Sequence, residues 1–537
     1  MTAAKRAALA GLALVVLAVV VLRAPSVRVD ILNEDEALYA TTAASMAEGA
    51  PPYRAGVESK PPGIFYLYEA GFAVVGRYDM RALHALTILW VLGTTLVVGA
   101  LARRATKSPT GPPALVTPAV VASLLYAGFV IVQEPAVLAT QCELLYSLPL
   151  ALAAYLIVRS SARGGWPSVL ALVGAGLLCG AGSLIKPTAI SLPVAATAWL
   201  VLRRPLLRGP DPWLHDLGRA ALLASGFAAA WGLAAAYFTH LGVWDDLVYW
   251  AFRWTLGTYI PTGSSHSPWL TRFFAGFVAW AAMLLILWVL AAVALRRTAR
   301  GRAEVKTPDA RDAPAQVVWL LALWTAAATA LTFLGGRFFD HYFPAVVPPL
   351  AALATVGYFA VRASMRWRRV VLGLALAPVF TCWFGALEYP ATMTLLGDDR
   401  KPYDQIAAYI QATTAPTDRV FVWGYYPLIY VAADRLAGSR FVGCHYLTGY
   451  AAIGLGQDLP PEIEDKLGVP DGFTTLLADL EASKPALFVD TSPGDLHHWR
   501  RYPLSRYPVL SEYVTSHYRY LTTIQGAALY RRTPDHP

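Results

Sequence analysis

About eleven apolar runs, each long enough to cross a membrane, occur along the chain, and no other feature limits its fold so strongly. A helix rises about 1.5 Å per residue, so about 20 residues cross a hydrocarbon core of about 30 Å. Only 15% of the residues are charged, where soluble chains carry about 25%. The sequence therefore predicts a polytopic α-helical membrane protein. The runs lie near residues 7–24, 82–102, 113–132, 144–159, 167–185, 188–203, 220–240, 271–295, 316–334, 343–361 and 369–389.

The basic residues predict the orientation of these helices. Although the net charge of +9 is typical of a nucleic-acid-binding protein, the arginines cluster between apolar runs, as in "RRATK", "RRPLLR", "RRTARGR" and "RASMRWRR". With the N-terminus in the cytoplasm, these clusters fall in every second loop, in agreement with the positive-inside rule. We therefore expect no nucleic-acid partner. We expect residues 25–80, a long first loop, and residues 391–537 to lie on the outer face.

The first run begins with basic residues and has an apolar core, as a cleaved signal peptide does. It has no convincing A-x-A cleavage motif, and Arg23 and Arg28 follow at once, so we expect a retained first helix. The four cysteines lie far apart without a C-x-x-C motif. This spacing predicts neither a disulfide framework nor a cysteine-rich metal site.

The C-terminal part has a different pattern. Short apolar runs typical of buried strands ("RVFVWG", "PALFVDT" and "GAALYRR") alternate with longer-period helical segments ("YDQIAAYIQATT", "TTLLADLEASK" and "PVLSEYVTSHYRYL"). The sequence therefore predicts two domains: a transmembrane domain over 1–390 and an extracytoplasmic α/β domain over 391–537.

Three consecutive acids, Glu34, Asp35 and Glu36, follow the first apolar run. In a structural interpretation, Asn33 or Asp35 caps a helix over about 36–48, and acids in the first turn suit the helix dipole. In a catalytic interpretation, a partly desolvated carboxylate at the mouth of a helix bundle acts as a base with a raised pKa. The spacing alone leaves both interpretations open.

Lys60 precedes two prolines, which prevent a helix there and hold the lysine in a stiff, extended segment. The following run, 63–76, is too short to span and is predicted to lie along the membrane surface. A lone lysine at this height usually snorkels to the interface. A rigid cation opposite an acidic cluster favours binding of a phosphate head group.

The stretches "DEALYATTAASMAEGAPPY" and "KPPGIFY" resemble the first outer loop of the bacterial PMT/ArnT-like membrane glycosyltransferases of the GT-C superfamily. In that family an acidic pair opens the loop, a G-x-x-x-Y-like stretch (here ending at Tyr53) follows, and a K-P-P segment leads into a second surface helix. The resemblance implies a GT-C fold. It also implies transfer of a sugar, with inversion, from a polyprenyl-phosphate donor to a lipid, glycan or protein acceptor on the outer face of the bacterial cytoplasmic membrane.

The resemblance also implies roles for residues. Asp35 matches the catalytic base that takes the proton of the acceptor hydroxyl, Glu36 orients the site, and Lys60 neutralises the departing phosphate. Tyr53 is a further candidate for substrate binding. With Glu34, the triplet has one acid more than the pair of the family. The assignment of the pair to Asp35 and Glu36 could therefore shift by one residue.

Further polar residues stand at outer helix ends. Glu143 is a candidate second acid, although an acid at a helix N-terminus is an equally good explanation. Arg337, His341 and Tyr342 in "GGRFFDHYFPAVVPP" are candidates for substrate binding, with aromatic belt residues as the alternative. An interfacial position explains Lys186 most simply.

No metal-ligand spacing stands out, and His497 and His498 are expected to be a solvated surface pair, so we expect neither a metal nor another cofactor. Two functions compete with the glycosyltransferase: a transporter or flippase of a lipid-linked sugar, and a non-catalytic membrane protein that binds the cell wall. Mannose, glucose, arabinose and aminoarabinose donors would all present the same phosphate, which leaves the sugar and the acceptor open.

Overall fold

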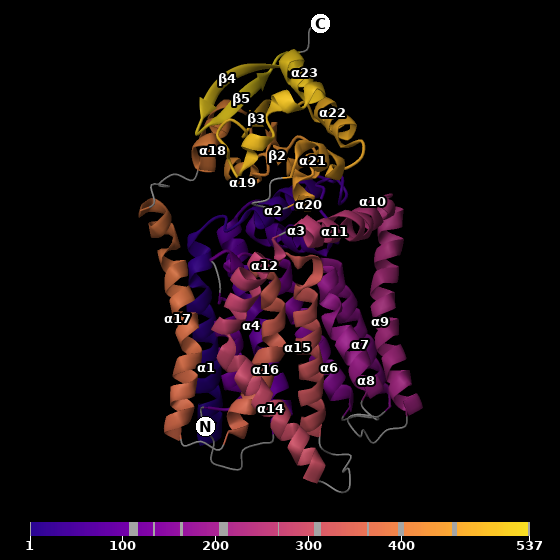
Figure 1. Ribbon diagram of the computed structural model, residues 1–537, viewed down its shortest axis with the longest axis vertical. Coiled ribbons are helices and arrows are strands. Elements are labelled where there is room, and N and C mark those ends of the chain that lie inside the picture. Colours follow the sequence, from indigo (N-terminus) through magenta and orange to yellow (C-terminus); the bar gives the residue numbers. More distant parts are fainter. Residues whose placement is uncertain are drawn as a thin grey trace.

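The computed structural model describes residues 2–106, 116–132, 135–161, 165–202, 213–266, 268–304, 313–361, 365–395, 402–453 and 459–534. A bundle of long helices carries a smaller α/β part on one end, and the N-terminus lies at the opposite end of the bundle (Figure 1). The cluster "RRPLLR" lies outside the described residues.

Within the described residues, seven helical segments are long and apolar enough to cross a membrane, so the chain is a multi-pass membrane protein. An eighth would be the bent pair Trp269–Met283 and Leu285–Gly301, which meet at 66°. The predicted spans near 113–132, 188–203 and 369–389 correspond to apolar helices of only 10–17 residues, so the count of eleven is not confirmed. The seven segments are Ala3–Arg28 (α1 and η1), Met80–Ala105 (α4), Cys142–Ser161 (α6), Trp166–Ile185 (α7), Trp213–His240 (α9), Pro314–Thr332 (in α15) and Asp340–Ala360 (η7 and α16).

Two short helices, α2 (Glu34–Ala47) and α3 (Gly63–Val75), lie between the bundle and the α/β part (Figure 1). They confirm the helices predicted near 36–48 and 63–76. The Asn33 side chain caps α2 by accepting a hydrogen bond of 3.0 Å from the Glu36 backbone N–H. Nearly all of α2 is buried, as expected for a helix with small or apolar side chains on every face.

The α/β part contains a five-stranded sheet in the order β2-β1-β3-β5-β4. The strands β2, β1 and β3 are parallel, whereas β5 is antiparallel to both β3 and β4. The central strands β1 and β3 are almost fully buried, which explains their short apolar runs. The strands are β1 (Arg419–Trp423), β2 (Leu436–Ala437), β3 (Leu487–Asp490), β4 (Tyr518–Ile524) and β5 (Ala527–Arg532).

The helices α18 (Pro402–Thr413) and α22 (Gly472–Ser483) lie where the sequence predicts them, but the prediction of a helix through residue 521 is wrong. Helix α23 (Pro508–His517) ends at His517, and β4 begins directly after it. Gln525 and Gly526 both have positive φ and form a tight turn that joins β4 and β5 as a hairpin. Pairing in this hairpin makes the residues after His517 a strand where the sequence predicts helix. The helix-like spacing of apolar residues continues into β4 and conceals the change.

The segment 48–62, which joins α2 to α3, is held from both sides. The Val57 N–H donates a hydrogen bond of 2.8 Å to the Arg440 carbonyl of the α/β part. Gly63 lies so close to the end of α7 that a Cβ atom there would be 2.5 Å from the Leu184 carbonyl oxygen. This segment is therefore fixed between the bundle and the α/β part.

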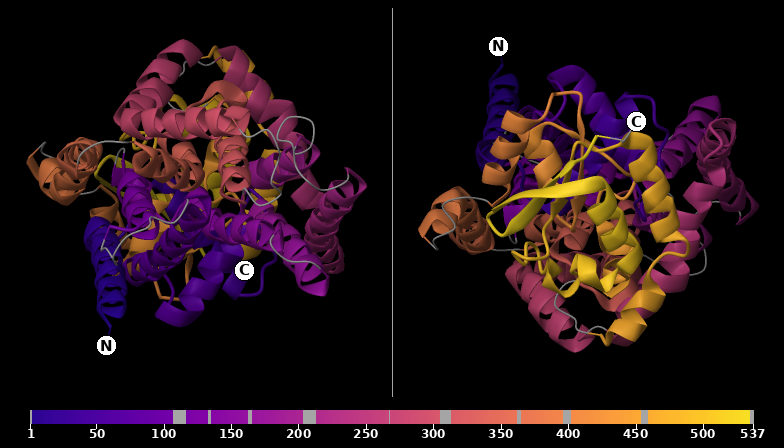
Figure 2. Two further views of the ribbon diagram at one scale, coloured as in Figure 1. Left: turned by 90° about the horizontal axis from the view of Figure 1, so that it is seen from below. Right: turned by 90° about the horizontal axis from the view of Figure 1, so that it is seen from above.

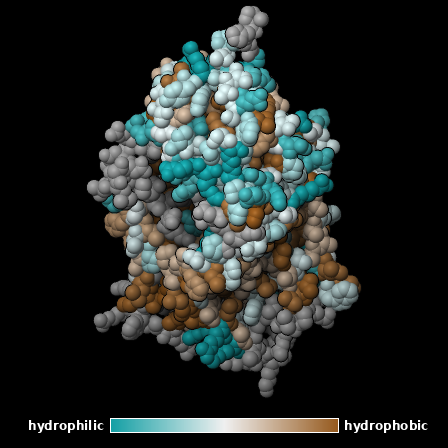
Figure 3. Space-filling view, turned by 45° about the horizontal axis from the view of Figure 1, so that its top comes forward, coloured by the Kyte–Doolittle hydropathy of each residue, from teal (hydrophilic) through white to brown (hydrophobic). Residues whose placement is uncertain are grey.

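Seen from above, the C-terminal elements cover the end of the bundle (Figure 2). Hydrophilic side chains gather on the α/β part, and hydrophobic ones on the flanks of the bundle (Figure 3). The junction between the two is thus the place where membrane-spanning helices and a water-facing domain meet.

Candidate active site

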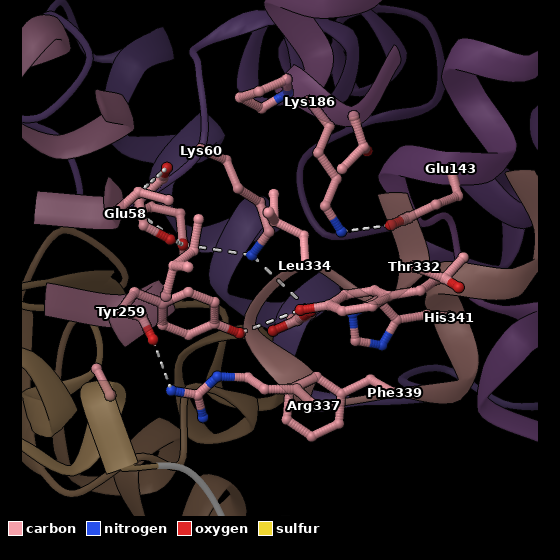
Figure 4. Close-up of a pocket in the computed structure, with 18 of the residues that line it drawn as sticks. Glu58, Lys60, Glu143, Lys186, Tyr259, Thr332, Leu334, Arg337, Phe339 and His341 are labelled. Atoms are coloured by element: carbon pink, nitrogen blue, oxygen red, sulfur yellow. Dashed lines mark hydrogen bonds and ion pairs between the residues drawn. The ribbon is translucent and has the colours of Figure 1, made fainter. Parts of the chain in front are cut away.

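A cavity of about 410 Å³ lies at this junction, within the size range typical of small-molecule sites. Most of the predicted site residues line it, and Lys60, Glu143, Arg337 and His341 surround it in Figure 4. Side chains from the C-terminal part also line it. We call the residues from the C-terminal part the roof and the mostly apolar residues from the last membrane-spanning segments the floor. The roof comprises Tyr425, His445, Tyr446, Tyr450 and His497; the floor comprises Ala328, Leu331, Thr332, Leu334 and Ala345.

Asp35 and Lys60 face each other in this cavity. The Lys60 Nζ lies 3.9 Å from Asp35 Oδ2 and 3.3 Å from Glu58 Oε1, and it stands 5.0 Å from the centre of the Tyr39 ring. The Lys60 and Asp35 side chains are only 15% and 19% exposed. Glu58 is not among the site residues predicted from the sequence, and its close ion pair with Lys60 adds it to the site.

The pKa values of this pair favour the charged forms. Burial acts to raise the pKa of the Asp35 carboxyl, but the positive charges of Lys60, His341 and Lys186 outweigh it and lower the pKa to about 2. Burial acts to lower the pKa of Lys60, but Asp35 and Glu58 raise it well above its usual value. The expectation of a raised pKa at the acidic cluster is therefore wrong for Asp35, because a lysine stands beside it.

A second lysine enters the same cavity. Lys186 forms an ion pair with Glu143 and lies 4.4 Å from the centre of the Tyr342 ring. Its side chain is 12% exposed, so it is a cavity residue as well as an interfacial one. Like Lys60, Lys186 precedes a proline. The Lys186 backbone is extended, which presents the amine from a stiff segment. The shared Lys-Pro sequence is the signal by which it could have been found.

Arg337, His341 and Tyr342 also line the cavity. The buried Arg337 guanidinium donates hydrogen bonds to the carbonyl oxygens of Tyr259 (3.1 Å), Ile453 (3.0 Å) and Ala452. It thereby joins the bundle to helix α20 (Tyr450–Ile453) of the C-terminal part.

His341 and Tyr342 have local partners. The His341 Nδ1 lies 3.6 Å from Asp340 Oδ1, and the hydroxyl oxygens of Tyr342 and Tyr259 are 3.1 Å apart. Both rings therefore stand in fixed positions at the wall of the cavity.

Glu36 and Tyr53 are buried and do not line the cavity. Glu36 Oε2 lies 3.1 Å from His84 Nε2 and accepts a 3.3 Å bond from the Thr140 N–H, while Oε1 accepts one from the Leu32 N–H. The Tyr53 hydroxyl donates a bond of 3.0 Å to the Lys60 carbonyl. Glu36 thus anchors the first turn of α2 behind Asp35, and Tyr53 anchors the backbone of Lys60.

No roof residue is predicted as a site residue from the sequence. The Tyr425 hydroxyl donates a bond of 3.2 Å to Asp35 Oδ1. The expectation that His497 is a solvated surface residue is wrong, because its side chain is 14% exposed and its Nδ1 lies 3.2 Å from Glu34 Oε1. Glu34 is therefore paired with the C-terminal part, whereas Asp35 is the acid of the triplet that faces Lys60.

Among the described residues, no group of three or more His, Cys, Asp or Glu side chains has the arrangement of a metal site. The absence of a metal requirement stays a prediction.

One protein-family model matches a part of the chain. Residues 59–231 match the model of the family described as dolichyl-phosphate-mannose-protein mannosyltransferase. No curated protein sequence matches the chain.

Solved structures match over almost the whole chain. ArnT from Cupriavidus metallidurans in the apo state is 15% identical, with a TM-score of 0.59 and 98% of each chain covered. The same protein bound to undecaprenyl phosphate is 15% identical, with a TM-score of 0.58 and 97% of each chain covered. The archaeal oligosaccharyltransferase AglB from Archaeoglobus fulgidus, in complex with an inhibitory peptide and a dolichol-phosphate, is 14% identical, with a TM-score of 0.50 over 98% of this chain and 74% of that one.

At this level of identity the structural matches show the fold. Together with the family model, they confirm the resemblance that the first loop of the sequence carries. The chain has the GT-C fold of the PMT/ArnT-like membrane glycosyltransferases.

Proposed function

We propose that this protein is an integral-membrane glycosyltransferase. It moves a sugar from a polyprenyl-phosphate donor to an acceptor hydroxyl on the outer face of the bacterial cytoplasmic membrane. The observation that carries the proposal is the pairing of Asp35 with Lys60 at 3.9 Å in a cavity where the membrane-spanning helices meet the C-terminal part. A carboxylate and a rigid cation at this place match the two ends of the reaction, proton removal and phosphate departure.

The two lysines are suited to a lipid phosphate. Lys60 and Lys186 both line the cavity, and each stands on a stiff Lys-Pro segment. Cations fixed in advance stabilise developing negative charge without reorganisation at the moment of reaction. The mostly apolar floor lines the same cavity, and most of its residues belong to membrane-spanning segments, which suits a prenyl chain.

Asp35 acts as the base in this mechanism. The acceptor O–H gives its proton to the Asp35 carboxylate while the acceptor oxygen forms a bond to the anomeric carbon. The bond from that carbon to the phosphate oxygen breaks, and polyprenyl phosphate leaves with the electron pair. Attack from the side opposite the phosphate inverts the configuration.

The donor itself would strengthen this base. In the free protein Lys60 lowers the pKa of Asp35, and a carboxyl with a pKa near 2 is a weak base. A bound phosphate shares the charge of Lys60, so the pKa of Asp35 rises toward the range in which a carboxylate removes protons. Binding of the donor and activation of the base are thus coupled through one lysine.

The test is release of polyprenyl phosphate by the full-length protein in lipid nanodiscs, with a panel of undecaprenyl-phosphate sugars and candidate acceptors. We expect release by the wild type and loss of release in Asp35→Asn and Lys60→Ala. The exposed residues Asp245 and Lys466 offer matched controls, Asp245→Asn and Lys466→Ala, which should behave as the wild type. Binding of donor lipids without release by the wild type would favour the transporter instead.

A further inference from the structure

A second cavity, of about 350 Å³, lies between helices α1, α4 and α5 (Pro118–Phe129), at the end of the bundle where the chain begins (Figure 1). It shares no lining residue with the candidate active site, which lies at the other end. The topology predicted from the basic residues makes this end cytoplasmic. The α1 wall of the cavity consists of small or apolar residues at helical spacing: Ala4, Ala7, Ala8, Gly11, Leu12 and Val15.

This cavity is open to lipid. Helix α1 lies at the edge of the bundle in both views of Figure 2, and its side chains Leu9 and Leu17 are 54% and 60% exposed. Apolar side chains that are exposed on a membrane-spanning helix face the acyl chains of the bilayer. Ala4, Ala8 and Leu12, which line the cavity, are exposed as well, so a lipid chain can enter it from the side.

The length of the cavity indicates the kind of chain that fits it. From Ala4 to Val15 a helix rises about 17 Å, which is about half of a hydrocarbon core of about 30 Å. An acyl chain of a phospholipid occupies one leaflet, so the two lengths match. A membrane-spanning helix of a partner protein would need a groove along the whole core, and an undecaprenyl chain is much longer than one leaflet.

The rim of this cavity is cationic. Arg103, in the last turn of α4, lines the cavity, is exposed, and has no ion pair or hydrogen bond from its guanidinium to any described residue. The neighbouring Arg104 has a partner, because it donates a bond of 3.3 Å to the Tyr155 hydroxyl. Lys5 and Arg6 are exposed in the first turns of α1, and no acidic residue is among those that line the cavity. Basic pockets between membrane-spanning helices on the cytoplasmic side suit anionic head groups.

The start of α5 offers further groups to an anion. Thr117 lines the cavity and caps α5, since its hydroxyl oxygen accepts a bond of 3.2 Å from the Val120 N–H. The hydroxyl proton of Thr117 has no acceptor among the described residues, so a phosphate oxygen can accept it. The positive end of a helix also favours an anion. A phosphate at this rim would therefore meet Arg103, the Thr117 hydroxyl and the N-terminus of α5 together.

We propose that this cavity binds an anionic phospholipid of the cytoplasmic leaflet. The phosphate lies beside Arg103 and Thr117, and one acyl chain lies along the small-residue wall of α1. The inference does not rest on the proposed function, because the site is separate from the candidate active site. It gives the protein a lipid ligand that fills the space between α1 and the helices α4 and α5.

The test measures lipid retention by native mass spectrometry of the full-length protein, with phosphatidylglycerol, phosphatidylethanolamine and undecaprenyl phosphate as probes. We expect the wild type to retain phosphatidylglycerol about fivefold more tightly than the zwitterionic phosphatidylethanolamine. Arg103→Gln should weaken retention of phosphatidylglycerol about fivefold, because one cation at the membrane surface is lost, and Arg103→Lys should restore most of it. Ala8→Phe should fill the cavity and remove this retention. Both variants should retain undecaprenyl phosphate as the wild type does, because Lys60 and Lys186 lie at the other end of the bundle.

Arg300→Gln and Ala292→Phe are the matched controls, because both residues are exposed on helix α14 (Leu285–Glu304) and neither lines the cavity. If the wild type retains both phospholipids equally, or if Arg103→Gln and Ala8→Phe lose no more phosphatidylglycerol than the controls, the lipids are ordinary neighbours in the bilayer and the proposal is overturned. It is also overturned if undecaprenyl phosphate displaces phosphatidylglycerol from the wild type, or if the wild type is a dimer that Ala8→Phe dissociates. These outcomes involve no turnover, so they stand apart from the success or failure of the proposed function.

Discussion

On the bundle side of the cavity, both lysines have acidic partners: Lys60 has Asp35 and Glu58, and Lys186 has Glu143. On the roof side, the Tyr450 hydroxyl is buried without a hydrogen-bond partner among the described residues, and Tyr425 and Tyr446 present rings. A charged pair holds its own geometry before a substrate arrives, whereas an unpartnered neutral group gains a partner only when a ligand binds. Under the proposed function, we assign the reaction to the bundle side and expect the roof side to contact the substrate.

The largest effect should come from the base itself. Asp35→Asn removes the proton acceptor while keeping the shape of the side chain, so kcat should fall roughly 100- to 10,000-fold. Retention of undecaprenyl phosphate should persist, because Lys60 and Lys186 remain. Initial rates of polyprenyl phosphate release measure the loss; an Asn variant within threefold of the wild type would remove Asp35 from the chemistry.

Lys60→Ala should lower kcat/KM about 100-fold, since one fixed cation opposite the leaving phosphate is lost. It should also change the pH profile. In the wild type the pKa of Asp35 is about 2, so the acid limb of kcat/KM, which reports the free protein, lies below the accessible range. Without Lys60 this pKa rises and the limb moves to higher pH.

The same coupling predicts that the pH profiles of kcat and of kcat/KM differ in the wild type. The acid limb of kcat, which reports the complex with substrate, should lie at higher pH than that of kcat/KM, because the bound phosphate shares Lys60. Coincident limbs in the wild type, or an unmoved limb in Lys60→Ala, would contradict the coupling between donor and base.

Tyr425 reaches from the roof to the base and therefore joins the two sides. Tyr425→Phe removes the hydroxyl that donates to Asp35 Oδ1 at 3.2 Å, and kcat should fall about tenfold with little change in KM. Stopped-flow or steady-state kinetics over a donor series separate the two constants. A rise in KM with unchanged kcat would show that the hydroxyl contacts the donor and does not position the carboxylate.

The smallest effect should follow from the pair between Glu34 and His497. Glu34→Gln keeps a hydrogen-bond acceptor but removes the negative charge, so kcat/KM should fall only about two- to fivefold. The variant also tests which acid is the base. If Glu34→Gln lost activity to the degree expected of Asp35→Asn, the assignment would shift by one residue.

Much of the bundle side was predictable because its signals are local. The acids 34–36, the Lys60 segment and the two surface helices lie within one continuous loop, and proline and capping rules act over a few residues. Glu143, Arg337, His341 and Tyr342 could be listed as polar residues at helix ends. What the sequence could not give was the pairing between them, since that depends on how distant helices pack.

The roof had no such signal. Tyr425 and His445 lie about 390 and 410 residues after Asp35. Tyr425 follows strand β1, and His445 lies in the short 3-10 helix Cys444–Tyr446. Nothing in their sequence neighbourhood differs from that of ordinary buried aromatic residues. His497 was assigned to the surface because an adjacent histidine pair usually is solvated. The pKa of Asp35 was predicted in the wrong direction for a related reason: burial was evident from the sequence, but the distance to Lys60 was not.

The bonds of Arg337 have a consequence for how the molecule can be divided. Two of the three carbonyl groups that accept from its guanidinium, those of Ala452 and Ile453, belong to the C-terminal part. A fragment that ends near residue 390 would keep this cation in its interior and lose most of its acceptors, a costly arrangement. The transmembrane and C-terminal domains that the composition predicts are therefore not independent folding units, and we expect both to unfold in a single thermal transition.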